Sequence, residues 1–376
     1  MQEAEMVETT DILVIGAGMA GCGAAAELAA DARVIVLEME DRPAYHTTGR
    51  SAATFILNYG NDVLRALNAA SADVLRSGGH LAEQGFLSPR GVLQVEEPGQ
   101  DAAFDAYTSG ASGLEILTPE DVVRYFPIYR PDMVVRGALE ADASDIDVDG
   151  LLQAYIRRLR GAGGRVVPNA KVTAIKRKGD IWHLETPAGE FEAPVVVNAA
   201  GAWGDVVAET AGIAPVDLTP CRRSVAVVPA PEDTRHWCLT ASVAETWYAK
   251  PDGGRLWVSP ADKDPVEPHD AYPDDMVLAG GLHRFSEATT LEVTRVERSW
   301  AGLRTFAPDH TPVNGAEPGK DGFHWLVGQG GYGIQTAPAM SRLAADLILD
   351  RPPVLPAATV AALSPDRFRQ PERIPE

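Results

Sequence analysis

A glycine-rich turn between two apolar segments constrains the fold of this chain more than any other stretch. Residues 12–15 form a short β-branched run that is typical of a buried parallel strand, and residues 33–37 have the same character. Between them, Gly16-Ala17-Gly18-Met19-Ala20-Gly21 leads into an alanine-rich segment that extends to about Ala30. The order of strand, glycine turn, helix and strand predicts a βαβ unit.

The spacing of the three glycines indicates what this unit binds. Gly16 permits the tight turn, Gly18 lets the backbone approach a pyrophosphate, and Gly21 lets the helix pack closely on the strand. The N-terminus of the helix offers free N–H groups and the positive end of its dipole to phosphates. Glu38 ends the second strand, where a carboxylate can accept hydrogen bonds from both ribose hydroxyls. The unit therefore predicts a dinucleotide site, and Glu38 argues against a 2′-phosphate.

Length and composition narrow the class of protein. A chain of 376 residues predicts two domains, and 45% hydrophobic with 23% charged residues is typical of a soluble globular protein. The formal charge of −20 argues against nucleic acid or an anionic membrane as a partner. The first ten residues lack the apolar core of a signal peptide, and no apolar run approaches the roughly 18 residues that a transmembrane helix needs. We therefore expect a soluble cytoplasmic protein.

Cysteines and histidines give no sign of a metal site. The three cysteines (Cys22, Cys221 and Cys238) are odd in number, widely spaced and form no CxxC pair, which argues against both a disulfide framework and a zinc site. Metal-ligand spacing is also lacking among His46, His183, His283, His310 and His324. We expect these histidines to be structural or solvent-facing, with His46 the strongest exception.

The rest of the chain predicts a second domain inserted into the first. Parallel-type strands recur at the valine run of residues 195–197 and at residues 323–328. Between them, residues 221–300 alternate apolar and polar positions, are rich in proline and show no long helical pattern, while Asp252-Gly253-Gly254 predicts a hairpin. We predict an α/β fold: a Rossmann domain formed by residues 1–86, 144–218 and 310–376, with an antiparallel-sheet substrate domain formed by residues 87–143 and 219–309.

A run of acidic residues at 145–150 resembles the opening of a calcium-binding loop. The twelfth position of such a loop would be Ile156, where a bidentate glutamate is needed. A helix cap explains the run better, since Asp147 or Asp149 can accept from the first N–H groups of a helix over residues 151–160.

A second glycine-rich turn near the C-terminus favours FAD over NAD. Gln329-Gly330-Gly331-Tyr332-Gly333 follows the strand at residues 323–328 and precedes a helix. If that helix begins near Gly333, its N-terminal dipole would face the pyrimidine edge of a flavin and stabilise the negative charge that develops there on reduction. A plain NAD-dependent dehydrogenase has no use for such an element.

Several motifs together resemble the D-amino acid oxidase superfamily of flavoproteins. They are the first glycine turn, YHTTGRSAA from Tyr45, AAGAW from Ala199, CRRS from Cys221, WAGLR from Trp300 and QGGYGIQT from Gln329. The closest likeness is to the D-arginine dehydrogenase-like FAD-dependent D-amino acid dehydrogenases. The resemblance implies a glutathione-reductase-type FAD domain. It also implies oxidative deamination of a D-amino acid by hydride transfer from Cα to flavin N(5), giving a 2-oxo acid and ammonia. The electron acceptor would be a quinone, a carrier or molecular oxygen. The lack of any cysteine after Cys238 indicates that the FAD is bound non-covalently.

The resemblance also implies which residues contact the cofactor. They are Gly16, Gly18, Met19, Ala20, Gly21, Glu38, Met39, His46, Thr47, Thr48, Gly49, Arg50, Ser51, Ala52, Val172, Ala200, Gly201, Trp203, Gly330, Gly331, Tyr332, Gly333, Ile334 and Gln335.

Two arginines are the candidate binders of the substrate carboxylate. A carboxylate in a partly dry pocket is best met by bidentate guanidinium groups, and by resemblance these belong to Arg223 and Arg304. Arg222 should point away from them, because side chains alternate along a strand. The resemblance places Tyr59 and Tyr248 beside the substrate. The backbone carbonyl near Gly331 is a candidate acceptor for the substrate amine.

Two departures from the close relatives affect mechanism and specificity. Thr54 stands where those relatives have a histidine, which favours solvent over a protein base, and Val92 stands where the arginine-preferring relatives carry a carboxylate. We therefore expect a preference for apolar or aromatic D-amino acids. The alternatives are an oxidase of sarcosine, glycine or another secondary amine with the same fold and, in a different class, a non-catalytic FAD-binding protein.

Overall fold

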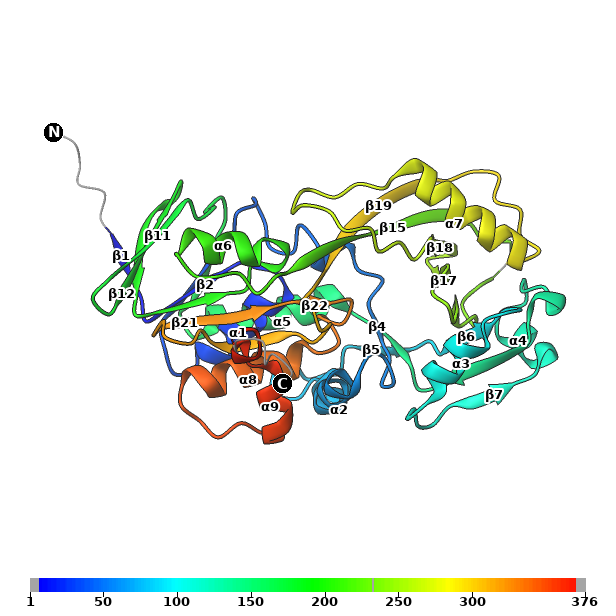
Figure 1. Cartoon of the computed structure of the whole chain (residues 1–376), viewed down its shortest axis with the longest axis horizontal. Helices are drawn as coiled ribbons and strands as arrows, with labels where there is room; N and C mark the ends of the chain where they lie inside the picture. The colour runs from blue at the N-terminus through cyan, green and yellow to red at the C-terminus, as the bar shows by residue number, and fades with distance from the viewer. Residues whose placement is uncertain (1–6, 232, 370–376) are drawn as a thin grey trace, which may run out of the picture.

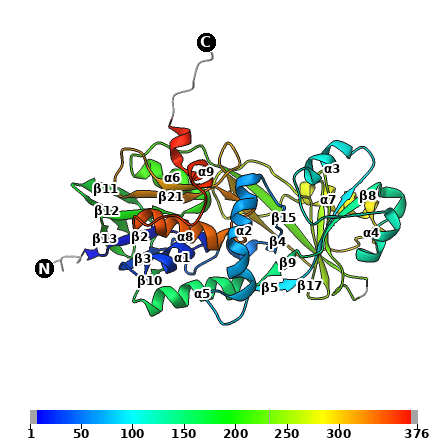
Figure 2. The ribbon, with the colours of Figure 1, turned by 90° about the horizontal axis from the view of Figure 1, so that it is seen from below.

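The computed structural model describes residues 7–231 and 233–369 of the chain. The molecule is elongated, with two lobes side by side (Figure 1). One lobe contains both the N-terminal and the C-terminal part of the described chain, and the other is built from middle segments (Figures 1 and 2).

A six-stranded sheet forms the centre of the first lobe. In spatial order its strands are β10 (Arg165–Val167), β3 (Val34–Leu37), β2 (Ile12–Ile15), β14 (Val195–Asn198), β21 (Phe323–Val327) and β20 (Val313–Ala316). Pairing is parallel from β10 to β21, and only β20 runs antiparallel to its neighbour. Every residue of β2, β3 and β21 is buried, which explains why these strands are continuously apolar rather than alternating.

Helices cover one face of this sheet (Figure 2). α1 (Met19–Leu28) packs between α5 (Val148–Gly161) and α8 (Ala337–Ile348) in one apolar cluster. Close approach explains the small residues of α1, since a Cβ on Gly23 would lie 2.1 Å from the Ser341 hydroxyl. α5 begins at Val148, and its N-cap Asp147 accepts from Gly150 N at 2.9 Å, so the predicted cap is confirmed for Asp147.

Smaller sheets complete the first lobe and connect it to the second. A four-stranded sheet covers the opposite face of the central sheet, in the order β1 (Glu8–Thr9), β13 (Gly189–Ala193), β12 (Ile181–Thr186) and β11 (Ala174–Lys178). A three-stranded sheet of β4 (Thr54–Phe55), β9 (Ser144–Ile146) and β5 (Leu87–Pro89) lies near the junction of the lobes (Figure 2).

A nine-stranded, mostly antiparallel sheet extends through the second lobe. In spatial order its strands are β22 (Gln329–Gly330), β19 (Arg298–Phe306), β15 (Thr219–Pro229), β18 (Arg255–Ser259), β17 (Tyr248–Asp252), β16 (Leu239–Ser242), β6 (Val92–Glu96), β8 (Arg136–Glu140) and β7 (Glu115–Leu117). The predicted hairpin joins β17 to β18, with both Gly253 and Gly254 at positive φ. β22 brings the second glycine-rich turn against β19, since Gly330 pairs with Thr305.

The α-helices not yet described are α2 (Asp62–Ser77), α3 (Asp101–Thr108), α4 (Pro119–Tyr125), α6 (Gly204–Thr210), α7 (Asp275–Ala288) and α9 (Ala357–Leu363). Two helices, α7 and α8, differ from what the sequence predicts. The expectation that residues 221–300 hold no long helix was wrong, because α7 runs for 14 residues and contacts β18. The helix expected to begin near Gly333 begins at Ala337 instead, and the residues before it form turns.

Candidate active site

The first glycine turn has the geometry that its spacing predicts. Gly16 has a φ of +102°, and a Cβ there would lie 2.6 Å from Ala199 O. A Cβ on Gly21 would lie 1.9 Å from Gly16 O, so the helix can approach the turn only because residue 21 has no side chain. Gly18 is different. The nearest atom to a Cβ on Gly18 would be the Thr48 hydroxyl oxygen at 3.4 Å, so space remains on that side for another molecule.

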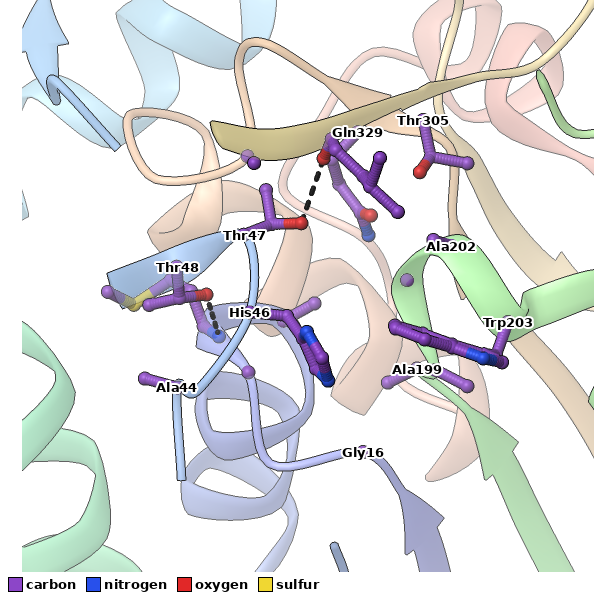
Figure 3. A pocket seen from close by; sticks show the side chains of 18 of the residues that line it. Gly16, Ala44, His46, Thr47, Thr48, Ala199, Ala202, Trp203, Thr305 and Gln329 are labelled. Atoms are coloured by element: carbon purple, nitrogen blue, oxygen red, sulfur yellow. Dashed lines mark hydrogen bonds between the residues drawn. The ribbon is translucent and has the colours of Figure 1, made fainter. Parts of the chain in front are cut away.

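The N-terminus of α1 opens toward a loop that contains Thr48. Gly18 is the N-cap residue and provides no side-chain cap, and no acidic residue lies in the first turn. Met19 N donates to the Thr48 hydroxyl at 3.0 Å, as Figure 3 shows. The positive end of the helix dipole therefore faces a cavity without a protein carboxylate in its own first turn.

Glu38 places a buried carboxylate at one end of this cavity. Its Oε2 accepts from Ala17 N at 2.7 Å and its Oε1 from Glu40 N at 3.0 Å. Burial raises the pKa of Glu38 and outweighs the two backbone hydrogen bonds, which act to lower it. The carboxylate is thus tied to the glycine turn and set in the position where a ribose is expected.

We call the cavity that begins at Glu38 the long cavity. It passes the glycine turn and the loop of residues 44–52 and ends at the second glycine-rich turn. His46 and Trp203 both line it, and their rings contact each other with centroids 4.6 Å apart (Figure 3). Of the predicted cofactor residues, those that line it are Gly16, Gly18, Met19, Ala20, Glu38, Met39, His46, Thr47, Thr48, Arg50, Ser51, Ala52, Val172, Ala200, Gly201, Trp203, Gly330, Gly331, Gly333 and Ile334.

A second hollow, the side pocket, continues from the long cavity. The two share seven lining residues: Ser51, Ala52, Arg223, Tyr248, Arg304, Gly331 and Ile334. Tyr59 and Gln335 line the side pocket but not the long cavity. All five residues predicted to contact the substrate (Arg223, Arg304, Tyr59, Tyr248 and Gly331) therefore lie around one pocket.

The neighbouring strands β15 and β19 place Arg223 and Arg304 at the side pocket. Arg223 Nε donates to Asp262 O at 2.7 Å, and Arg304 donates to the Tyr59 hydroxyl at 3.5 Å. The Nη2 atom of Arg223 is buried and has no hydrogen-bond partner among the described residues. A buried donor of this kind is costly unless a ligand satisfies it.

The arginine pair is electrostatically uneven. Burial lowers the pKa of Arg223, and the positive charge of Arg304 lowers it further. Burial also acts to lower the pKa of Arg304, but its interactions with Tyr59, Tyr248 and Glu245 outweigh this effect and raise the pKa. Since an arginine stays protonated near neutral pH, the pocket contains two positive charges close together.

This geometry can be compared with known proteins. A family model described as FAD dependent oxidoreductase matches residues 11–347. The chain belongs to this family of FAD-dependent oxidoreductases. The predicted cofactor is thereby confirmed, and the long cavity fits it, because a buried carboxylate, a helix N-terminus with no carboxylate in its first turn and a second glycine-rich turn all line it.

The chain is also similar in sequence to curated proteins along most of its length. The bifunctional protein ThiO/ThiG of Synechocystis sp. is 25% identical over 378 residues, which cover 96% of this chain and 55% of that protein. The chain spans about half the length of the curated relatives it matches.

Solved structures confirm the predicted α/β fold class. The glycine oxidase of Geobacillus kaustophilus superposes with a TM-score of 0.83 at 20% identity, covering 95% of this chain and 98% of that one. The L-proline dehydrogenase of P. horikoshii also gives 0.83 at 20% identity, covering 97% and 99%.

Some predicted cofactor residues of the flavoprotein lie outside both hollows. Gly21 packs against the glycine turn, and Gly49 approaches Ala44 O. Tyr332 contacts Tyr59 with ring centroids 4.7 Å apart, behind the pocket wall. These three residues shape the site rather than line it.

Sequence reasoning missed two polar residues of the side pocket, Gln94 and Glu245. Val92, on which the specificity prediction rests, is fully buried and packs in the cluster that contains Ile56, Leu239 and Tyr248. Gln94 lies two residues further along β6, on the same face, and lines the pocket. Alternation along β6 could have identified Gln94, whereas no local signal pointed to Glu245.

Two negative findings apply to residues 7–231 and 233–369. Within these ranges no helix is both long and apolar enough to cross a membrane. The same ranges contain no group of three or more His, Cys, Asp or Glu side chains that could hold a metal ion.

Proposed function

We propose that this flavoprotein oxidises the Cα–N bond of D-amino acids to give 2-oxo acids and ammonia. The observation that carries the proposal is the pair formed by Arg223 and Arg304, at the point where the side pocket joins the long cavity. The free Nη2 atom of Arg223 and the guanidinium of Arg304 are both donors that can bind the oxygens of a carboxylate.

Residues along the long cavity would hold FAD non-covalently. We assign the ribose to Glu38, the pyrophosphate to the N-terminus of α1, and the flavin end to the turn at residues 330–334. Bound there, FAD supplies a two-electron acceptor that takes hydride from the substrate Cα. The cysteines (Cys22, Cys221 and Cys238) are buried free thiols, which supports non-covalent binding.

The chain's own contribution is to bind and orient the substrate. Arg223 and Arg304 fix the carboxylate, the phenol rings of Tyr59 and Tyr248 wall the pocket, and the Gly331 carbonyl accepts from the amine. Holding Cα at the entrance to the long cavity in this way supplies most of the rate enhancement as orientation. The α-ammonium loses one proton to solvent, because Thr54 stands where a base would be needed. Water then converts the released imine to the 2-oxo acid and ammonia.

The pocket walls support a preference for apolar or aromatic side chains. Part of the side pocket wall is apolar, formed by Ile56, Ile146, Leu239, Ala241, Trp247 and Ala261. An aliphatic or aromatic substrate side chain would bury apolar area against them, at about 25 cal/mol per Å². The electron acceptor and a cytoplasmic location stay predictions from the sequence.

Anaerobic bleaching of the flavin tests the proposal directly. We expect D-leucine and D-phenylalanine to reduce the bound flavin, with the L-isomers at least a hundredfold slower. Failure of every D-amino acid in a panel of neutral, basic and acidic side chains would overturn it.

A second candidate is oxidation of glycine or a secondary amine such as sarcosine. It is favoured by the superposition on a glycine oxidase, and it would use the same arginine pair. The same bleaching assay separates the two, since this alternative predicts faster reduction by glycine or sarcosine than by D-leucine.

A further inference from the structure

Glu245 is a carboxylate in the side pocket that the proposed reaction does not use. It lies in the tight turn between β16 and β17, and its side chain is 43% exposed, so it occupies the solvent end of the pocket. Its φ of +54° is in the left-handed region, which is unfavourable for a glutamate by roughly 1 kcal/mol.

The turn that carries Glu245 is firmly attached to the sheet. Glu245 N donates to Ser242 O at 2.8 Å. The Ser242 hydroxyl donates to Glu97 at 3.1 Å, and the indole of Trp247 donates to the same carboxylate, also at 3.1 Å. The position of the Glu245 backbone is therefore determined by the fold rather than by surface mobility.

Glu245 balances charge in the pocket. Among the described residues that line the side pocket, it is the only carboxylate, and it shares the pocket with the guanidinium groups of Arg223 and Arg304. Asp262 is nearby, but its carboxylate already accepts from the backbone and hydroxyl of Ser224. Burial acts to raise the pKa of Glu245, but its hydrogen bond to Lys263 and the charges of Lys263, Arg223 and Arg304 together outweigh burial and lower the pKa, so Glu245 is ionised near neutral pH.

Lys263 pairs with Glu245 from outside the pocket. The two side chains form an ion pair, and Lys263 is 54% exposed. With a monocarboxylate bound and its amine neutral, the charges of the groups that line the pocket are those of the two arginines, the Glu245 carboxylate and the substrate carboxylate, and they sum to zero. The Lys263 charge lies outside the pocket. A second substrate carboxylate would disturb this balance.

We propose that Glu245 and Lys263 set the charge selectivity for the substrate side chain. Glu245 supplies the second negative charge that the arginine pair needs, and so it excludes substrates with a second carboxylate. Because Lys263 forms an ion pair with Glu245, Glu245 is not available to pair with a basic substrate side chain. Neutral side chains are left as the favoured class. This inference rests on the proposed function for its substrate class, but its charge argument applies to any carboxylate ligand.

Two variants test the pair in the FAD-loaded enzyme. Glu245→Gln keeps size and hydrogen bonding but removes the negative charge, and Lys263→Met frees Glu245. Glu297→Gln is the matched control, since Glu297 pairs with Arg255 at the protein surface and lines neither hollow. The first readout is the binding of acetate and malonate, which is measured as a change in the flavin absorbance. The second is anaerobic flavin reduction by D-leucine, D-lysine and D-glutamate.

We expect Glu245→Gln to increase the preference for malonate over acetate, and for D-glutamate over D-leucine, by at least tenfold. A tenfold change corresponds to about 1.4 kcal/mol. Lys263→Met should increase the preference for D-lysine over D-leucine, and Glu297→Gln should change no ratio.

Ratios within twofold of wild type for Glu245→Gln in both assays would overturn the inference. If malonate selectivity shifts but no D-amino acid reduces the flavin, the role of Glu245 is supported and the proposed amino acid oxidation fails. If D-leucine reduces the flavin but no selectivity ratio changes in the variants, the proposed amino acid oxidation is supported and the role of Glu245 fails.

Discussion

Arg223 and Arg304 lie diagonally opposite each other on neighbouring antiparallel strands. Arg223 pairs with Gly302, and Arg304 pairs with Cys221, two positions further along. Both side chains therefore emerge on the same face of the sheet, and Gly302 provides no side chain between them. Arg222 points to the other side, where it forms an ion pair with Asp264 at 2.7 Å.

Replacing either arginine of this diagonal should remove most carboxylate binding. We expect Arg223→Ala and Arg304→Ala each to lower the efficiency of flavin reduction by at least thirtyfold, because losing one partner of a buried ion pair costs about 2–5 kcal/mol. Stopped-flow reduction across substrate concentrations measures this. Arg222→Ala is the control and should stay within a few fold of wild type. Unchanged reduction in both arginine variants would rule out the clamp.

Gly18 and Gly21 should separate cofactor binding from folding. Alanine at Gly21 would place Cβ 1.9 Å from Gly16 O, so we expect Gly21→Ala to destabilise the apoprotein as well as weaken FAD binding. Gly18→Ala meets nothing closer than 3.4 Å in the protein, so the apoprotein should melt within about 2 °C of wild type while FAD affinity falls at least tenfold. Thermal melts of apoprotein and FAD titration by fluorescence measure the two effects. Equal loss of stability in both variants would contradict this division.

The parallel sheet could be predicted from the sequence because its signals are local. Strands such as β2 and β21 are buried on both faces and therefore appear in the sequence as continuous apolar runs, and Gly16 and Gly21 mark the turn from β2 into α1. The predicted domain boundaries stay a prediction.

Features that depend on distant contacts were missed. Glu245 lies in a turn far in sequence from Arg304, and only the pairing of the nine-stranded sheet brings the two into one pocket. α7 was missed because two adjacent glycines, Gly280 and Gly281, weaken the helical signal. The reason for one of them is tertiary: Gly281 packs against Pro260.

This explanation of α7 predicts opposite effects for its two glycines. A Cβ on Gly281 would lie 2.3 Å from Pro260 Cβ and 2.5 Å from Pro260 Cα, so Gly281→Ala should destabilise the protein by about 1–3 kcal/mol. A Cβ on Gly280 would come no closer than 3.6 Å to the Arg284 side chain, so Gly280→Ala should stabilise by about 0.5–1 kcal/mol through helix propensity. Urea unfolding monitored by circular dichroism gives both values. Stabilisation by Gly281→Ala would show that the contact with Pro260 does not constrain the helix.

His324 should make stability depend on pH. Its side chain is buried in β21, where Nε2 donates to Asn314 Oδ1 at 2.9 Å, because the amide nitrogen of Asn314 already donates to Met340 O. Burial lowers the pKa of His324 to about 3. The histidine thus stays neutral in the folded state, whereas in the unfolded chain it binds a proton below its ordinary pKa of about 6.5.

The sign of the effect follows from this difference. The stabilisation is fully present above about pH 6.5 and is lost as the pH falls toward 3, because the unfolded state binds up to one more proton, with a slope of about 1.4 kcal/mol per pH unit. We expect His324→Gln to lose up to this much slope between pH 4 and 6, measured as the free energy of urea unfolding at a fixed FAD concentration. His283→Gln is the control, since His283 is 73% exposed on α7. An unchanged slope in His324→Gln would mean that His324 is already protonated in the folded protein, which its burial without a carboxylate partner among the described residues argues against.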